Sequence, residues 1–166
     1  FIPGVIFSIA GLLTTIFLVK DTTHFVNAES LKSKVPMLQN VWKETSWKHQ
    51  NLGSVTLNGL VNNLNDGVVW GLLPVLLMQK GFGIDQIGII AGIYPAVWGI
   101  SQLFTGKLGD SHCKKQIITS GMFLQALAII IMALATSLPF LIFASVLLGL
   151  GTALVYPNFL SVVAEW

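Results

Sequence analysis

The chain has 166 residues, of which 54% are hydrophobic and only 10% are charged, and its formal net charge is +2. Soluble domains average about 25% charged residues, so this composition excludes an ordinary soluble domain and indicates an integral membrane protein. The basic residues are all lysines, and no run of them has the density of a nucleic-acid site, so we expect no nucleic-acid partner.

Apolar stretches divide the chain into five predicted membrane spans. The first covers residues 1–19, which can just cross the hydrocarbon core at about 1.5 Å per residue. A polar segment, residues 20–50, follows, and its helical spacing of apolar residues favours a short interfacial helix. The other spans are expected at about 52–78, 87–104, 117–135 and 140–164. We therefore expect an all-α integral membrane protein, and a fragment, because the chain begins inside one apolar run and stops where another ends.

The span at 52–78 carries polar side chains at membrane depth. On a helix, four of them fall within an arc of about 100°: Asn58, Asn62, Asn65 and Asp66. Such residues usually face a protein interior or a wet cavity, and an ionised carboxylate there is costly unless it is hydrated or paired. Asp66 is therefore predicted to carry a proton or hold a cation. The alternative is a structural acid, with the asparagines acting as hydrogen-bonding links between helices.

Two later spans hold further candidates for a transport path. Tyr94, Trp98 and Gln102 recur every four residues and share one face, which suits either a flat or amphipathic solute or plain aromatic packing. The last span contributes Thr152, Tyr156 and Asn158, and Tyr156 next to a proline suggests a flexible break near a gate.

The spans lack the residues that an intramembrane enzyme would need. No predicted span contains histidine or cysteine, whereas catalysis there would require a nucleophile–base pair or a metal cluster. We therefore expect no enzymatic activity, no cofactor and no metal site.

The lysines predict the orientation of the chain in the membrane. Five spans place residues 20–50 and 106–115 on one side with eight of the nine lysines, and only Lys80 on the other. Cytoplasmic loops are enriched in lysine and arginine, so both segments are expected to be cytoplasmic in a multi-pass protein of the cell membrane.

The segment Gly106 to Lys115, GKLGDSHCKK, is the most specific motif. It resembles the signature loop of the major facilitator superfamily. The matching residues are Gly106, Leu108, Gly109, Asp110, Lys114 and Lys115. Ser111 stands where the family has a basic residue, and Cys113 where it has a glycine. The runs LVNNLNDGVVWGLLP and GLGTALVYPNFLSVVAEW also look like helices of that family, so the resemblance extends over essentially the whole chain.

This resemblance implies a twelve-helix bundle. Residues 1–19 would be the last helix of the N-terminal six-helix half, 20–50 the cytoplasmic linker, and 51–166 the first four helices of the C-terminal half. The partners would be the bilayer, a small-molecule or ion substrate, and the helices missing at both ends. The spans at 52–78 and 140–164 would line a central cavity, and 117–135 would face lipid.

The implied function is secondary active transport of a small solute by alternating access, with proton coupling through Asp66 as one form of it. The alternative is a transporter-like sensor or assembly protein without transport activity.

Overall fold

The computed structural model describes residues 2–19, 23 and 40–164, and the chain divides into two units, residues 1–39 and 40–166. In the first unit, α1 (Ile2–Leu18) is an apolar helix of 17 residues. At 1.5 Å per residue it is about 25 Å long, slightly short of a hydrocarbon core of about 30 Å. The apolar stretch expected at 1–19 is thus a helix.

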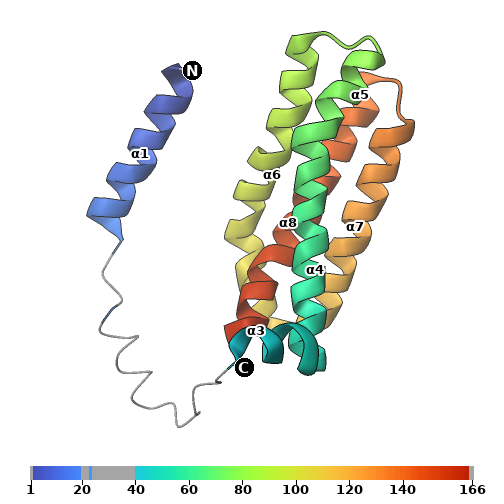
Figure 1. Ribbon diagram of the computed structural model, residues 1–166. Coiled ribbons are helices and arrows are strands. Elements are labelled where there is room, and N and C mark those ends of the chain that lie inside the picture. Colours follow the sequence, from blue (N-terminus) through green and yellow to red (C-terminus); the bar gives the residue numbers. More distant parts are fainter. Residues whose placement is uncertain (1, 20–22, 24–39, 165–166) are drawn as a thin grey trace. The chain divides into compact units, whose positions relative to one another are not determined.

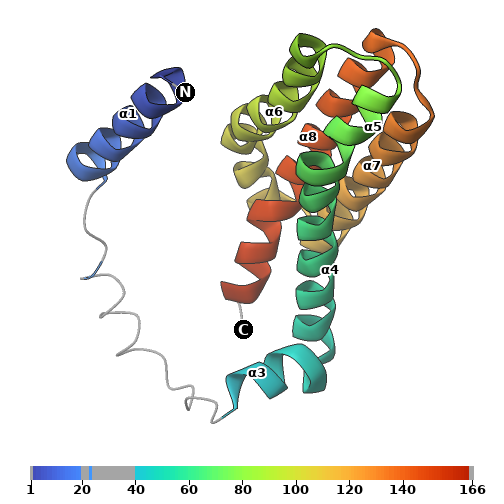
Figure 2. The same ribbon diagram turned by 45° about the horizontal axis from the view of Figure 1, so that its top comes forward.

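The second unit is a bundle of long helices (Figure 1). Its elements are α3 (Val41–Lys43), η1 (Glu44–Lys48), α4 (Gln50–Gly67), η2 (Val68–Leu72), α5 (Leu73–Gln79), α6 (Ile84–Ser111), α7 (Lys114–Leu134) and α8 (Leu138–Ala164). The elements α4, η2 and α5 continue as one helical rod (Figure 2). The segment η2 is a π-helix, a wider turn often found at functional sites.

Four helices of this unit are long and apolar enough to cross a membrane: Gln50–Gln79, Ile84–Gly109, Lys114–Leu134 and Leu138–Val163. They coincide with the four spans expected between residues 52 and 164, although each is longer at one or both ends. The elements of the described residues are all helical, which confirms the all-α membrane fold.

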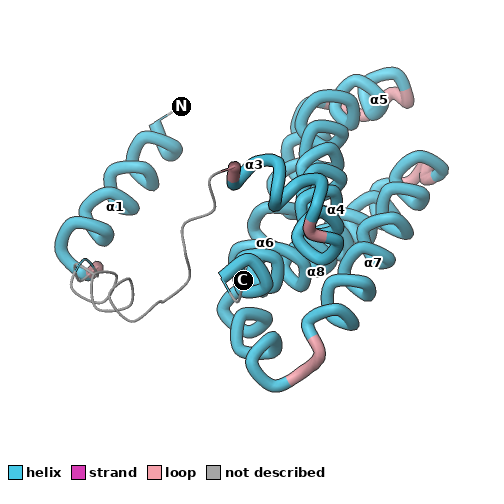
Figure 3. Tube along the Cα trace, turned by 60° about the horizontal axis from the view of Figure 1, so that its bottom comes forward, coloured by secondary structure: helices cyan, strands magenta, loops and turns pink. Residues whose placement is uncertain are grey.

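Short connections join these helices (Figure 3). Between α5 and α6, Gly81 has a φ of +85°, a left-handed conformation that costs glycine little. The connection between α6 and α7 is shorter than the motif suggested, because α6 continues to Ser111 and leaves only His112 and Cys113 between the helices. The expectation of a loop at residues 106–111, based on their polar character, is wrong. The backbone hydrogen bonds of the helix continue through this segment, up to the bond from His112 N to Leu108 O at 3.1 Å.

Helix α8 packs against both α6 and α7, and α4 also contacts it. The contact between α7 and α8 depends on glycines: a Cβ built on Gly121 would lie 2.8 Å from the carbonyl oxygen of Gly151, and the reverse distance is also 2.8 Å. Small residues let membrane helices approach closely. One side of α7 is buried, through Ile117, Ile118, Gly121, Gln125, Ala128 and Met132. That the remaining side faces lipid stays a prediction.

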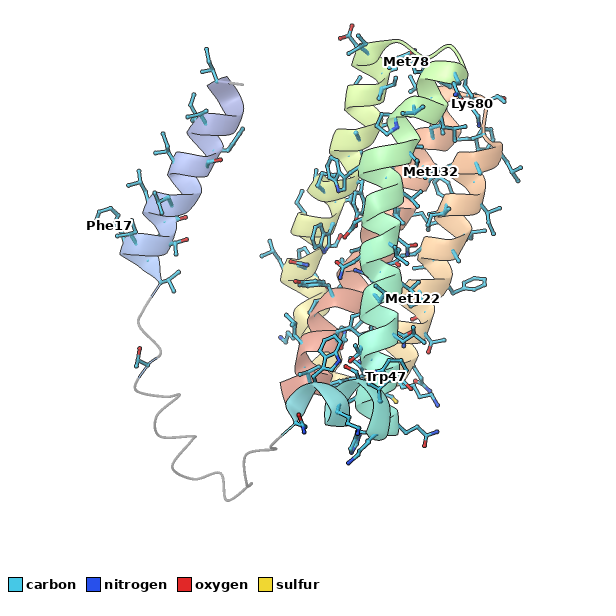
Figure 4. All side chains as sticks on the ribbon, in the orientation of Figure 1. Phe17, Trp47, Met78, Lys80, Met122 and Met132 are labelled. Carbon is cyan, nitrogen blue, oxygen red and sulfur yellow. The ribbon has the colours of Figure 1, made fainter. Side chains whose placement is uncertain are left out.

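Lys80, in the connection between α5 and α6, is hydrogen-bonded to the end of α7, next to the connection between α7 and α8. Its Nζ donates hydrogen bonds to the carbonyl oxygens of Ala133 (2.8 Å) and Ala135 (2.7 Å) at the C-terminus of α7. A cation is favourable there because the last carbonyls of a helix lack intrahelical partners. Lys80 and Trp47 lie at opposite ends of the bundle (Figure 4). We call the end that holds Trp47 and the α6–α7 connection the lysine-rich end.

Candidate functional site: a buried polar network

Polar side chains of α4 are hydrogen-bonded to a glutamine of α7. Asn65 Nδ2 donates to Gln125 Oε1 at 2.7 Å, and Gln125 Nε2 donates to Asn62 Oδ1 at 2.8 Å. Gln125 Nε2 also donates to Thr152 Oγ1 of α8 at 3.1 Å. Gln125 is fully buried, with an exposed fraction of 0%. Its carboxamide thus fixes side chains of two other helices at once.

Tyr94 of α6 extends this arrangement to Asp66. The Tyr94 hydroxyl donates a hydrogen bond to the Asp66 carboxylate, and it lies 3.4 Å from Thr152 Oγ1. Thr152 in turn donates to the carbonyl oxygen of Leu148 on its own helix at 3.0 Å. We call the six residues that link α4, α6, α7 and α8 in this way the buried polar network: Asn62, Asn65, Asp66, Tyr94, Gln125 and Thr152.

The network holds one carboxylate and no lysine. Asn62, Tyr94, Gln125 and Thr152 are buried, whereas Asn65 and Asp66 are half-buried. The Tyr94 hydroxyl donates a hydrogen bond to Asp66, but a neutral donor cannot neutralise the charge of the carboxylate. A proton or a cation is therefore the natural complement of this carboxylate at membrane depth.

A row of aromatic rings lies beside the network. Trp98 stacks on Tyr94, with ring centroids 6.1 Å apart and planes inclined by 13°. Trp70 contacts Tyr94 at 6.3 Å, and Tyr156 meets Trp98 edge-on at 5.9 Å. Trp98 Nε1 is buried without a hydrogen-bond acceptor among the described residues. The structure therefore offers flat aromatic faces and one buried N–H donor on the rings that adjoin Tyr94, the residue hydrogen-bonded to the carboxylate.

The remaining candidates of the expected transport path lie outside the network. Asn158 is buried, and its Nδ2 donates to the carbonyl oxygen of Leu154 at 2.7 Å. Gln102 is half-buried on α6, one turn beyond Trp98. Asn58 is half-buried and lines a cavity of about 620 Å³. Tyr156 is exposed on one side and lines a smaller, apolar cavity of about 360 Å³ between α4 and α8.

The motif residues occupy the lysine-rich end. Gly109 lies against Asn158, because a Cβ at Gly109 would come within 2.2 Å of Asn158 Oδ1. Gly106 has open space around it, and Leu108 is exposed. Lys114 is half-buried, Lys115 lines the larger cavity, and the side chain of Asp110 lies outside the described part of the chain.

Sequence reasoning missed two residues of this site, Gln125 and Trp70. Gln125 was visible as an isolated amide in an apolar span, and a polar residue at that depth usually faces the protein interior. The sequence around Trp70 contains no comparable indication. Tryptophan is not distinguished from the apolar residues of a membrane span, and its contact with Tyr94 joins two different helices. The described residues contain no group of three or more His, Cys, Asp or Glu side chains that could hold a metal ion.

The geometry is that of a multi-pass membrane protein with an acidic, amide-rich centre shared by four helices. Comparison with known proteins identifies the family: the model of the Major Facilitator Superfamily matches residues 55–166. The chain belongs to this superfamily.

Several curated proteins are similar to the chain. An uncharacterized MFS-type transporter of Bacillus subtilis, YddS, is 31% identical over 157 residues, which cover 89% of this chain and 35% of that protein. The efflux pump terJ of Aspergillus terreus is 32% identical over 67% of this chain and 22% of its own length. The fosmidomycin resistance protein of Escherichia coli is 24% identical over 64% of this chain and 26% of its own length. The chain thus spans about a third or less of these relatives, and no solved structure matches it significantly.

Proposed function

We propose that the whole protein is a secondary transporter that moves a small molecule or ion across the membrane by alternating access, with Asp66 in its transport site. The observation that carries this proposal is the hydrogen bond from Tyr94 to Asp66 within a network shared by four helices. Asp66 lies 16 residues after Gln50 and 13 before Gln79, the ends of its span, or about 24 and 20 Å from them. An ionised carboxylate at that depth favours a proton or a cation as its partner.

The proposed solute is a small, partly flat molecule. The aromatic row provides ring faces that bind cations and planar groups, and it adjoins the carboxylate through Tyr94. The names of the relatives, an efflux pump and a fosmidomycin resistance protein, support a small organic solute. Proton coupling is part of the proposal, since protonation of Asp66 would remove the charge on which binding of a cation depends.

The proposal also assigns the parts of the chain within the whole protein. Residues 1–19 would be the last helix of the N-terminal half, 20–50 the linker, and 51–166 the first four helices of the C-terminal half. The family match covers residues 55–166, within the last of these segments. The partners of this chain would then be the bilayer and the remaining helices of the same protein.

The test is Asp66→Asn in the full-length protein, reconstituted in proteoliposomes. Transport of ethidium and of labelled fosmidomycin would be measured between pH 5 and 8, the range that includes most physiological conditions. We expect the variant to lose at least about tenfold in rate, or to lose its pH dependence, because a neutral amide cannot exchange a proton. Asn63→Ala, at an exposed position of the same helix, is the matched control. Unchanged rate and pH profile in Asp66→Asn would make Asp66 structural.

The proposed orientation places the lysine-rich end in the cytoplasm. Cys113 is exposed in the α6–α7 connection, so its thiol is available for labelling. With other cysteines of the full-length protein replaced, we expect an impermeant maleimide to label Cys113 only after the cells are permeabilised. Labelling of intact cells would reverse the orientation.

A further inference from the structure

The larger cavity opens at the lysine-rich end, between α4, α7 and α8. Its volume is about 620 Å³, and its lining combines six polar residues, Gln50, Asn51, Ser54, Asn58, Lys115 and Thr119, with three apolar ones, Val55, Ile118 and Val162. A cavity of this size is normally hydrated where amides, hydroxyls and a lysine line it, because these groups need hydrogen-bond partners. Asn58, a candidate of the transport path, and Lys115, a residue of the signature motif, both line this cavity, but neither assignment gives the cavity itself a role.

The cavity and the buried polar network lie along the same seam between α4 and α7. On α4, polar residues follow one another at intervals of three or four, which places them on one face: Asn51, Ser54, Asn58, Asn62 and Asn65. The first three of them line the cavity, and the last two belong to the network. On α7, Lys115 lines the cavity and Gln125 is in the network. Between Asn58 and Asn62 there is one helical turn, or about 6 Å.

We propose that this cavity is a water-filled entry that brings protons from the lysine-rich end to the buried polar network and Asp66. The inference deepens the proposed function, on which its proton-carrying role rests. Tyr94 is the titratable group that faces Asp66 from α6, while Gln125 from α7 and Thr152 from α8 are uncharged. Lys115 is the charged group in the lining of the cavity. The entry runs along α4 and α7, whereas the aromatic rings of Tyr94 and Trp98 belong to α6.

The first test measures whether water reaches Asn58. In the full-length protein in nanodiscs, with native cysteines replaced by serine, Asn58→Cys and Ser54→Cys are treated with the charged thiol reagent MTSET. We expect rates within about tenfold of that of Cys113 retained as the single cysteine, because the reacting thiolate forms in water. Leu57→Cys is the matched control: Leu57 is next to Asn58 on α4 but is 61% exposed outside the cavity, so a cysteine there should react at least about a hundredfold more slowly in lipid. Rates for Asn58→Cys as low as those for Leu57→Cys would overturn the proposal, since lipid or other helices would then fill the cavity.

The second test measures whether protons use this entry. Trp70 and Trp98 contact Tyr94, so their fluorescence after a rapid pH jump reports on the Asp66–Tyr94 hydrogen bond. We expect Asn58→Leu, with Ser54→Val as the second variant, to slow this relaxation at least about tenfold, because an apolar side chain interrupts the hydrated path. Asn63→Leu, the same substitution at an exposed position, should leave the rate unchanged. An unchanged rate in both seam variants would overturn the proposal. If the fluorescence change after the pH jump persists in Asp66→Asn, the proposed role of Asp66 is wrong. The MTSET rates then still show whether water fills the cavity.

Discussion

Helices α4 and α7 show that the number of polar residues in a span is a poor guide to their importance. Helix α4 has four asparagines near its middle, yet Asn63 is exposed and Asn58 only half-buried. Helix α7 is apolar apart from a few side chains, yet Gln125 is fully buried and makes three hydrogen bonds to α4 and α8. The role of a polar side chain in these two helices therefore depends on the helices that surround it, and four substitutions test this conclusion.

The largest effect is expected from Gly121→Ala, which acts on the contact between α7 and α8. The new Cβ would lie 2.6 Å from Val155 Cγ2 and 2.8 Å from the Gly151 carbonyl oxygen, so the helices must separate. We expect a loss of about 3 kcal/mol in the free energy of unfolding, as for other overpacked contacts. Thermal unfolding of the full-length protein in detergent measures it. Gly59→Ala on α4, where a Cβ meets nothing within 4 Å, should cost nothing detectable.

Gln125→Leu should destabilise the protein by about 2 kcal/mol, because it removes three hydrogen bonds between helices. Such bonds average about 0.6 kcal/mol each in membrane proteins, and the loss also leaves the amide of Asn62 buried without its partner. Gln116→Leu, the same substitution at an exposed position of α7, is the control. Equal unfolding temperatures for the two variants would mean that the network adds no stability.

Lys80→Met should cost about 1 kcal/mol, since it removes two charge-assisted hydrogen bonds to the C-terminus of α7 but leaves the aliphatic part of the side chain. Hydrogen exchange of the last turn of α7 would detect the loosened end. Lys107→Met, at an exposed position, should leave that turn unchanged. Unaltered protection in Lys80→Met would show that the lysine does not hold α7.

The smallest effect is expected from Asn63→Ala. The side chain is exposed, so the unfolding free energy should change by less than about 0.5 kcal/mol, as is usual for surface substitutions. The same thermal unfolding assay applies. A loss as large as that of Gln125→Leu would mean that another part of the protein covers this face of α4, and the comparison between the two helices would no longer hold.

The class of the protein and most of its helices can be predicted from the amino-acid sequence alone. Long apolar runs leave few alternatives to membrane helices, because hydrocarbon offers no partners for the backbone. The spacing of Asn62, Asn65 and Asp66 placed them on one face, and the structure brings them into one network. The motif at residues 106–115 pointed to the superfamily, which the family match confirms. The orientation and the transport role of these residues remain predictions.

Which side chains contact one another depends on how the helices pack. Gln125 and Trp70 enter the site because α7 and η2 bring them against other helices, and helical periodicity says nothing about the rotation of one helix relative to its neighbour. The last turns of α6 show the same effect of packing. Glycine normally weakens a helix by about 1 kcal/mol, but at Gly109 the missing side chain permits close approach to Asn158 of α8. The local pattern of residues predicts which side chains share one face of a helix. The helix that packs against this face is distant in the sequence, so the local pattern cannot identify it.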